Sequence, residues 1–273
     1  MNAAARLLSE YTALARILEP KDFLALLKAS AAHAPDVLRD KTLTKIDVAM
    51  SRQIVVQFNS SRLVLPLSEI DGLLQARNDN PTFGNVREIY GRNCYLSHLP
   101  LKNPQRIVLD LGANRGMFSL LALVHLGATM VVGVEPVPLY LPVYKLLLEA
   151  NRCLSQSTPR YTRFISSPSE ELRDPQRNVS ILTIMKEQGI ERFDLAKMDI
   201  EGGEKAIFEE PEWLSSVNNL TMELHPHLVG DLSHIPAALN HYGFQYRLLD
   251  QAGNNVAIHS AMFLVASSVG AVQ

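Results

Sequence analysis

Apolar residues along this chain change their spacing near Pro104, and the change predicts two kinds of structure. Leucine and alanine recur at helical spacings over residues 3–32 with a break at Pro20, which predicts two helices. Apolar residues then alternate with polar ones, which predicts a small antiparallel meander over residues 46–50, 54–58 and 63–65. A further helix is expected over residues 70–76.

After Pro104, short apolar runs alternate with helix-periodic segments, a rhythm that is typical of a parallel sheet covered on both faces. The expected strands are residues 106–110, 129–135, 160–166, 193–199, 220–224, 244–249 and 262–265. The expected helices are residues 117–126, 138–151, 180–188, 203–209 and 232–242. Gly and Asn in residues 250–255 suit a closing hairpin, which leaves one strand antiparallel. The prediction is an α/β domain over residues 101–273 behind a helical and β-meander extension over residues 1–100.

Residues 110–116 lie between an apolar strand and an apolar helix, and they predict a glycine-bearing cofactor turn. Gly112 has no Cβ, so backbone and ligand can approach closely there. A phosphate-binding turn usually has a denser glycine pattern and no carboxylate at the strand end, where Asp110 would repel a pyrophosphate. The ammonium and sulfonium groups of S-adenosylmethionine would instead be attracted. The turn favours that cofactor over a nicotinamide dinucleotide.

A second acid, Glu135, ends the next β-branched run and can accept both hydroxyls of an adenosine ribose. Either Asp110 or Glu135 alone could be a strand-end carboxylate facing water, but the ordered pair favours one shared ligand. Ligands of open α/β sheets bind beyond the carboxyl ends of the strands. We therefore expect a common rim made of Asp110, Glu135, Ser166, Asp199 and Glu223.

Residues 197–204 hold three carboxylates and one ammonium group within a short stretch. Acids this close repel one another, so burial would require a cation, hydrogen bonds or a raised pKa. We expect Asp199 to face the active site and Lys197 to pair with one of the acids. Glu201 and Glu204 can also face the active site, or they stand at the entry of the next helix, where the helix dipole alone could account for one of the two.

These pieces together resemble the FkbM-type S-adenosylmethionine-dependent methyltransferases. The resemblance spans about residues 100–265 and rests on residues 108–119, 134–136, Asn151, 196–204 and 223–225. It implies a class I methyltransferase (Rossmann-like), mostly parallel seven-stranded sheet. It also implies S-adenosylmethionine as donor and a hydroxyl acceptor on a small molecule, such as a sugar or a secondary metabolite. The chain departs from the family at Gly203, often Ala there, and in a loop rich in Ser and Pro over residues 166–169.

By the same resemblance, Asp110, Gly112 and Asn114 would hold the methionine part of the cofactor, and Glu135 its ribose. The whole predicted cofactor set is Asp110, Gly112, Asn114, Gly116, Glu135, Pro136, Ser166 and Asp199.

Methyl transfer from a sulfonium depends largely on positioning, and a hydroxyl acceptor gains from losing its proton to a base or from binding a metal. We nominate His225 as that base, because it follows the fifth strand and imidazole titrates near neutral pH. A histidine merely hydrogen-bonded in a loop is the alternative. Asp199 and Glu223 are further catalytic candidates that can jointly bind Mg²⁺, or bind substrate hydroxyls. The competing classes are an NAD(P)-dependent oxidoreductase and a catalytically silent binding module.

The composition of the chain limits the classes of binding partner that are expected. The chain has 273 residues and a net charge of −2 from 26 basic and 28 acidic residues, so no global field suits a polyanion and nucleic acid is not expected. Cys94 and Cys153 suggest neither a disulfide framework nor a zinc site. No apolar run reaches the roughly 18 residues of a membrane span, and charges interrupt the N-terminus. We expect a cytoplasmic protein without a membrane partner, whose residues 1–100 cap the cofactor cleft or form a homodimer.

Overall fold

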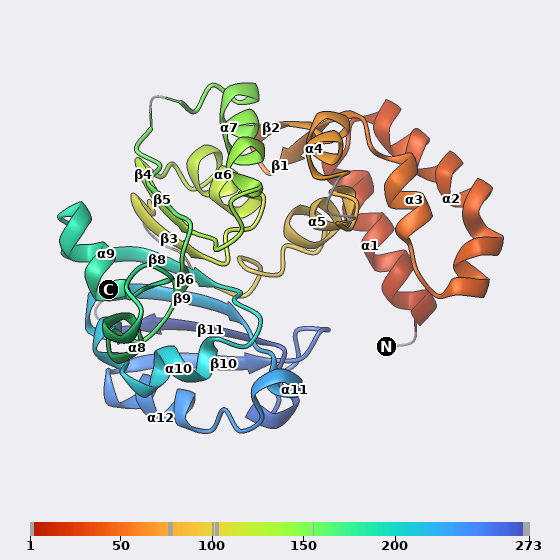
Figure 1. Cartoon of the computed structure of the whole chain (residues 1–273). Coiled ribbons are helices and arrows are strands. Elements are labelled where there is room, and N and C mark those ends of the chain that lie inside the picture. The colour runs from red at the N-terminus through yellow and green to blue at the C-terminus, as the bar shows by residue number, and fades with distance from the viewer. Residues whose placement is uncertain (1–2, 76–78, 100, 102–103, 155, 270–273) are drawn as a thin grey trace. The chain divides into compact units, whose positions relative to one another are not determined.

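The computed structural model describes residues 3–75, 79–99, 101, 104–154 and 156–269 (Figure 1). Backbone contacts divide the chain into two compact units that interleave along the sequence. The first unit comprises Met1–Cys94, Arg115–His125 and Leu139–Ser155, and the second comprises Tyr95–Asn114, Leu126–Pro138 and Gln156–Gln273. The predicted organisation into residues 1–100 and 101–273 follows different boundaries and stays a prediction.

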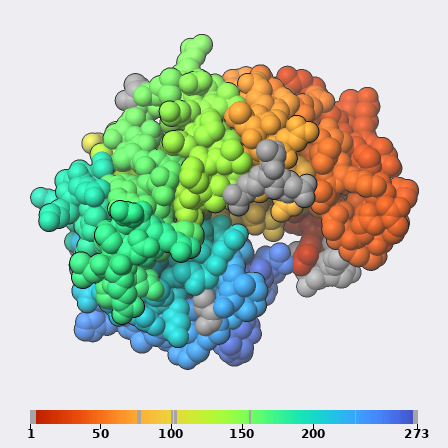
Figure 2. All heavy atoms as spheres, viewed as in Figure 1, coloured from red at the N-terminus to blue at the C-terminus, as the bar shows by residue number. Residues whose placement is uncertain are grey.

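The first unit is mostly helical. Its elements are α1 (Ala3–Ile17), α2 (Pro20–Asp40), α3 (Thr44–Ala49), β1 (Gln53–Phe58), β2 (Ser61–Pro66), α4 (Leu67–Leu74), α5 (Phe83–Asn85), the π-helix η2 (Val86–Gly91), α6 (Met117–Val124) and α7 (Tyr140–Ala150). The two predicted N-terminal helices are confirmed, and Pro20 begins the second, where its fixed φ suits a helix start. Much of α2 is exposed on the surface of this unit, in orange in Figure 2.

The predicted strand over residues 46–50 is wrong, because these residues lie in and just after α3. Ile46 and Met50 are 3% and 0% exposed, whereas Val48 between them is 58% exposed. Positions four apart share a helix face, so this alternation of three residues also fits one helical turn. The meander is thus reduced to the antiparallel hairpin of β1 and β2, in which Phe58 pairs with Ser61.

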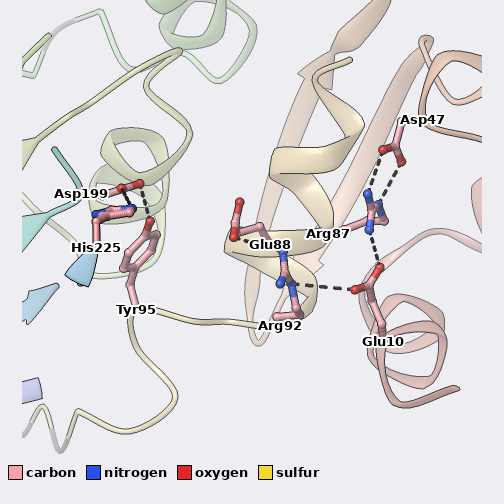
Figure 3. Close-up of polar contacts among 8 residues, drawn as sticks. All are labelled: Glu10, Asp47, Arg87, Glu88, Arg92, Tyr95, Asp199 and His225. Carbon is pink, nitrogen blue, oxygen red and sulfur yellow. Dashed lines mark hydrogen bonds and ion pairs between the residues drawn. The ribbon is translucent and has the colours of Figure 1, made fainter. Parts of the chain in front are cut away.

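An ion cluster joins three helices of the first unit. Arg87 in η2 donates to both carboxylate oxygens of Asp47 in α3, at 2.9 and 2.8 Å, and to Glu10 of α1 at 2.8 Å (Figure 3). Burial raises the pKa of Asp47, and the hydrogen bonds from Arg87 oppose that rise. Bidentate charge-assisted bonds of this kind are strong, so Arg87 holds α1 and α3 against η2.

The second unit contains the predicted seven-stranded sheet. Its strands are β3 (Ile107–Leu111), β4 (Met130–Val134), β5 (Arg160–Tyr161), β8 (Phe193–Met198), β9 (Val217–Glu223), β10 (Phe244–Leu249) and β11 (Phe263–Ser268). They are ordered β10-β11-β9-β8-β3-β4-β5 (Figure 1). All neighbours are parallel except β11, which runs antiparallel to both β9 and β10. The predicted α/β fold class and the closing hairpin are confirmed.

The predicted strand over residues 160–166 is divided. Only Arg160 and Tyr161 pair with β4, and β6 (Phe164–Ile165) pairs instead with β7 (Asn178–Val179) in a separate two-stranded sheet. Two polar residues, Thr162 and Arg163, interrupt the apolar run where the strand leaves the main sheet. Ser166 therefore does not end a strand of the seven-stranded sheet.

The second unit's remaining elements are α8 (Pro168–Arg173), α9 (Ile181–Gln188), α10 (Glu204–Glu209), η3 (Pro211–Ser216), α11 (Pro226–Val229), α12 (His234–His241) and η4 (Ile258–Ser260). Side chains of Ser167 and Ser180 accept from backbone N–H groups and cap α8 and α9. α10 packs on α12, and α12 packs on β10 (Figure 1). Within the described part of the chain, no helix is long and apolar enough to cross a membrane.

Candidate active site

Polar side chains interrupt the apolar core of the sheet where β3 and β8 end. Asp110 is paired in register with Lys197 on one side and with Gly133 of β4 on the other. Their strand neighbours Leu109, Leu111, Ala196 and Met198 are fully buried. Asp110 is itself 0% exposed and Lys197 only 3%. Charged residues are almost never this buried without partners. The buried pair of Asp110 and Lys197 therefore marks a candidate functional site.

Lys197 is held by oxygens from three sides. Its Nζ lies 3.4 Å from Asp110 Oδ1 and 3.8 Å from Asp199 Oδ2, and it donates to the carbonyl of Gly112 at 2.9 Å. The ammonium also lies 5.1 Å from the centre of the Tyr95 ring, a cation–π distance. The predicted pairing of Lys197 with an acid is confirmed. Two carboxylates and one ammonium (−2 + 1) leave this group with a formal charge of −1.

Gly112 is required by a close approach of backbone to backbone. Its φ is +69°, and a Cβ built there would lie 1.7 Å from the carbonyl oxygen of Asp199. The amides of Gly112 and Ala113 both donate to the carbonyl of Val134 at 3.0 Å, and Asp199 N donates to Leu111 O at 3.0 Å. The glycine thus brings the turns after β3 and β8 together.

Glu135 already shapes the turn after β3. It is 6% exposed, and its two carboxylate oxygens accept from the amides of Asn114 and Val137, each at 2.9 Å. Burial raises the pKa of Glu135, while these two hydrogen bonds act in the opposite direction. Arg160 donates to the carbonyl of Asn114, whose φ is +46°. Each carboxylate oxygen has a second lone pair, so Glu135 can still accept ligand hydroxyls.

His225 follows β9 and lies between two carboxylates. Its Nδ1 is 2.6 Å from Glu204 Oε1. Its Nε2 is 3.8 Å from Asp199 Oδ1 (Figure 3). The Tyr95 hydroxyl donates to the other oxygen of Asp199 at 2.8 Å. The hydrogen bond with Glu204 raises the pKa of His225; burial opposes this, and the charges of Glu204, Asp199 and Glu223 add to it.

Asp199, Glu223 and His225 also offer ligand atoms that all lie within 4.8 Å of one another. No other such group of histidine, cysteine or acidic residues occurs in the part of the chain that the structure describes. Oxygen ligands suit Mg²⁺, and imidazole suits transition metals better. The strand-end pair predicted for a metal is thus brought together with the predicted base.

Some of the residues predicted to bind the cofactor contact one another in the structure, and others lie apart. Asp110 and Gly112 meet Asp199 through Lys197 and the close backbone approach, and Asn114 meets Glu135. Pro136 is half-buried beside Glu135, and Ser166 is 5% exposed and donates to the carbonyl of Ser167. Gly116 belongs to the first unit, where its φ is +87° and a Cβ would lie 2.1 Å from Tyr144. Their cofactor roles stay predictions.

Sequence reasoning misses Tyr95 and does not decide the role of Glu204. Tyr95 contacts Asp199 across 104 positions of sequence, and no local pattern marks it. For Glu204, the sequence leaves open a place facing the active site and a role as an acid at a helix entry. The available signal is that Glu204 starts a helix and His225 follows the next strand of the sheet. Strand ends and helix starts meet at the same edge of the sheet, so the two side chains could be expected to lie close together.

The mostly parallel seven-stranded sheet, the glycine turn after β3 and the acids along the carboxyl edge of the sheet have the arrangement of a class I (Rossmann-like) methyltransferase fold. Residues 153–246 match the family model described as "Methyltransferase FkbM domain". The match confirms the resemblance to FkbM methyltransferases over this part of the chain. It identifies S-adenosylmethionine as the cofactor and favours methyl transfer over the nicotinamide-dependent alternative.

Solved structures that are similar to this chain include three methyltransferases. A ribosomal protein L11 methylase from Lactobacillus delbrueckii subsp. bulgaricus is 16% identical, with 62% of this chain and 72% of that chain covered and a TM-score of 0.37. The human methyltransferase 10 domain containing protein is 12% identical (67% and 80% covered, TM-score 0.39). The N-terminal domain of human METTL16 is 14% identical (74% and 67% covered, TM-score 0.40). These values are too low to carry an inference about substrate. The search of curated proteins found no match.

Proposed function

We propose that this chain transfers a methyl group from S-adenosylmethionine to a hydroxyl of a small molecule, such as a sugar or a secondary metabolite. The observation that carries the proposal is His225, an imidazole fixed on one side by buried Glu204 and facing Asp199 at the carboxyl edge of the sheet. A near-neutral base in this place suits an acceptor that must lose a proton. A net charge of −2 does not suit a nucleic acid acceptor.

The residues present fit the cofactor. A residual negative charge around Asp110, Lys197 and Asp199 suits a cationic ligand, and buried Glu135 suits ribose hydroxyls. Gly112 keeps the turn free of a side chain where backbone is closest. When bound, S-adenosylmethionine supplies a methyl group activated by a sulfonium.

The chain's own residues would then handle the proton. The acceptor hydroxyl would give its proton to Nε2 of His225, and its oxygen would take the methyl group that the bound sulfonium gives up, with S-adenosylhomocysteine as the leaving group. Glu204 at Nδ1 and Asp199 near Nε2 both stabilise the resulting imidazolium. Tyr95 holds Asp199 from the other oxygen and so limits its rotation.

A divalent cation such as Mg²⁺ is a second candidate, because the ligand atoms of Asp199, Glu223 and His225 lie within 4.8 Å. A cation there would orient the acceptor hydroxyl and lower its pKa. Elemental analysis and activity after EDTA treatment separate the two routes. Full activity without metal would remove the cation from the proposal.

Binding is tested first, by isothermal titration with S-adenosylmethionine, S-adenosylhomocysteine and NADH. Asp110→Asn and Glu135→Gln keep side-chain size while removing charge, and Glu191→Gln, an exposed acid of the same unit, is the matched control. We expect micromolar binding of the first two ligands by wild type and the control, and loss in both site variants. Binding of NADH alone would overturn the proposal.

Turnover is tested next, with a panel of hydroxylated sugars and phenols and release of S-adenosylhomocysteine as the readout. We expect at least one acceptor to be methylated by wild type and far more slowly by His225→Gln. Tight cofactor binding with the whole panel untouched would indicate a silent binding module instead.

The roles predicted for residues 1–100, a cap for the cofactor cleft or a homodimer interface, complete the proposal. Helices α1 and α2 supply buried Leu14 and Leu26 to the first unit, so the test uses the full chain. Light scattering of the full-length protein at assay concentration gives its mass directly. A monomeric mass would remove the homodimer.

A further inference from the structure

We infer that Glu204 is a positioning residue that fixes His225 with its hydrogen on Nδ1 and so reserves Nε2 for the acceptor. This inference rests on the proposed function, in which His225 acts at the carboxyl edge of the sheet. It adds a residue whose role no sequence motif or family match assigns.

The first support is the cost of burying Glu204. The side chain is 0% exposed at the first position of α10. Burying a carboxylate is expensive unless it is paired and hydrogen-bonded. Among the described residues, Oε2 of Glu204 has no hydrogen-bond partner, whereas Oε1 lies 2.6 Å from His225 Nδ1. The histidine is therefore the partner that accounts for this buried acid.

The second support is the geometry of the two ring nitrogens. A neutral imidazole has one N–H donor and one acceptor nitrogen, and its hydrogen bonds decide which is which. A carboxylate at 2.6 Å from Nδ1 requires the donor there. Nε2 lies 3.8 Å from Asp199 Oδ1, which is longer than a hydrogen bond. The acceptor nitrogen therefore faces that acid but is not hydrogen-bonded to it.

The third support is the contrast with Glu201, three residues earlier. Glu201 is exposed and has a φ of +46°, whereas Glu204 is buried in a regular helix. A helix dipole favours an acid in the first turn by about 0.3–1 kcal/mol at the surface. Such an effect gives no reason for burial against one particular ring. The ring of His225 also meets the ring of His227 edge-on, with the two ring centres 5.9 Å apart.

The test reads the tautomer directly, by ¹⁵N NMR of the full-length protein labelled at histidine and held at a pH where imidazole is neutral. His225→Gln identifies the resonance by its loss. We expect the wild-type ring to carry hydrogen on Nδ1 alone, Glu204→Leu to release a mixture of tautomers, and Glu204→Gln to retain the Nδ1 form in part. Glu209→Gln, an exposed acid of the same helix, should leave the spectrum unchanged.

Kinetics on an acceptor from the panel provide the second readout. We expect Glu204→Gln to lower kcat roughly tenfold to a hundredfold, as loss of an orienting partner does, with the KM for S-adenosylmethionine within about twofold of wild type. Hydrogen on Nε2 in the wild-type ring, or a spectrum that Glu204→Leu and Glu204→Gln leave unchanged, would overturn the inference. If Glu204→Leu does not fold, the wild-type and Glu204→Gln spectra decide alone. A Nδ1 tautomer without any methyl transfer would refute the proposed function and leave the positioning contact standing.

Discussion

Gly112→Ala tests whether the turn after β3 is built by backbone contact. The substitution adds a single methyl group to a half-buried turn and removes no hydrogen bond. Two separate costs follow from the structure, a positive φ and a collision with the neighbouring turn. Both are expected to reduce the stability of the second unit, and the collision is expected to displace Asp199 as well.

The two costs can be worked out separately. A φ of +69° costs a residue with a Cβ about 1–2 kcal/mol relative to glycine. The new methyl would lie 1.7 Å from the carbonyl oxygen of Asp199, so the backbone of one turn must move. Overpacking of this kind typically costs about 1–3 kcal/mol. The sum is about 2–5 kcal/mol in the free energy of unfolding.

Gly127→Ala is the matched control. Gly127 has a φ of +71°, nearly that of Gly112, but nothing lies within 4 Å of its built Cβ. It therefore isolates the backbone cost. For a protein of this size, each 1 kcal/mol lowers Tm by about 2–4 °C.

Calorimetry of both variants, with titration of S-adenosylmethionine, measures the difference. We expect the decrease in Tm to be about twice as large for Gly112→Ala as for Gly127→Ala. We also expect Gly112→Ala to bind the cofactor more weakly than wild type, while Gly127→Ala binds it normally. Equal losses of Tm, with normal binding in both variants, would refute the close approach.

Three further outcomes are expected. Arg87→Met should destabilise the protein by about 3–5 kcal/mol in chemical denaturation, because Asp47 is left buried without its cation; adding Asp47→Asn should recover part of the loss, and no recovery would contradict the pairing. Because the folded-state pKa of His225 is raised, its stabilising charge is complete below about pH 6.5. The contribution of charged His225 to the free energy of unfolding is lost as pH rises through its folded-state pKa. Glu204→Gln should therefore make the free energy of unfolding fall less steeply above about pH 6.5. Equal pH curves for wild type and variant would show that Glu204 does not raise the pKa of His225. EDTA should lower turnover only if a cation is used, and added Mg²⁺ should then restore it.

The architecture of the second unit could be predicted because its strands are buried on both faces. Such strands appear as continuous apolar runs, and the runs of β3, β4 and β8 lie within a residue or two of their predicted bounds. Local pattern failed where three alternating residues also fit one helical turn, as at Ile46 and Met50, and where Thr162 and Arg163 interrupt a run. Tertiary burial decides such short segments.

The candidate site was predictable to the extent that it follows from strand ends. Asp110, Asp199 and His225 each end or follow a strand, and parallel strands bring those positions to one edge. Tyr95 could not be found in this way, because it belongs to no strand or helix and reaches Asp199 through a loop. Contacts of this kind depend on the path of a loop, which hydrophobic periodicity does not encode.

The acids of residues 197–204 have different surroundings in the fold, which shows why composition alone could not assign a role to each of them. All lie within one short stretch, yet the fold sends each to a different environment: Asp199 to Lys197 and Tyr95, Glu201 to solvent and Glu204 to His225. The positive φ of Glu201 turns the chain between half-buried Asp199 and buried Glu204. The repulsion that the sequence predicts for the cluster is thus reduced, because Asp199 and Glu204 each face a cationic or donor group: Lys197 and Tyr95 for Asp199, and His225 for Glu204. Of these partners, the histidine is the one that can release a proton near neutral pH.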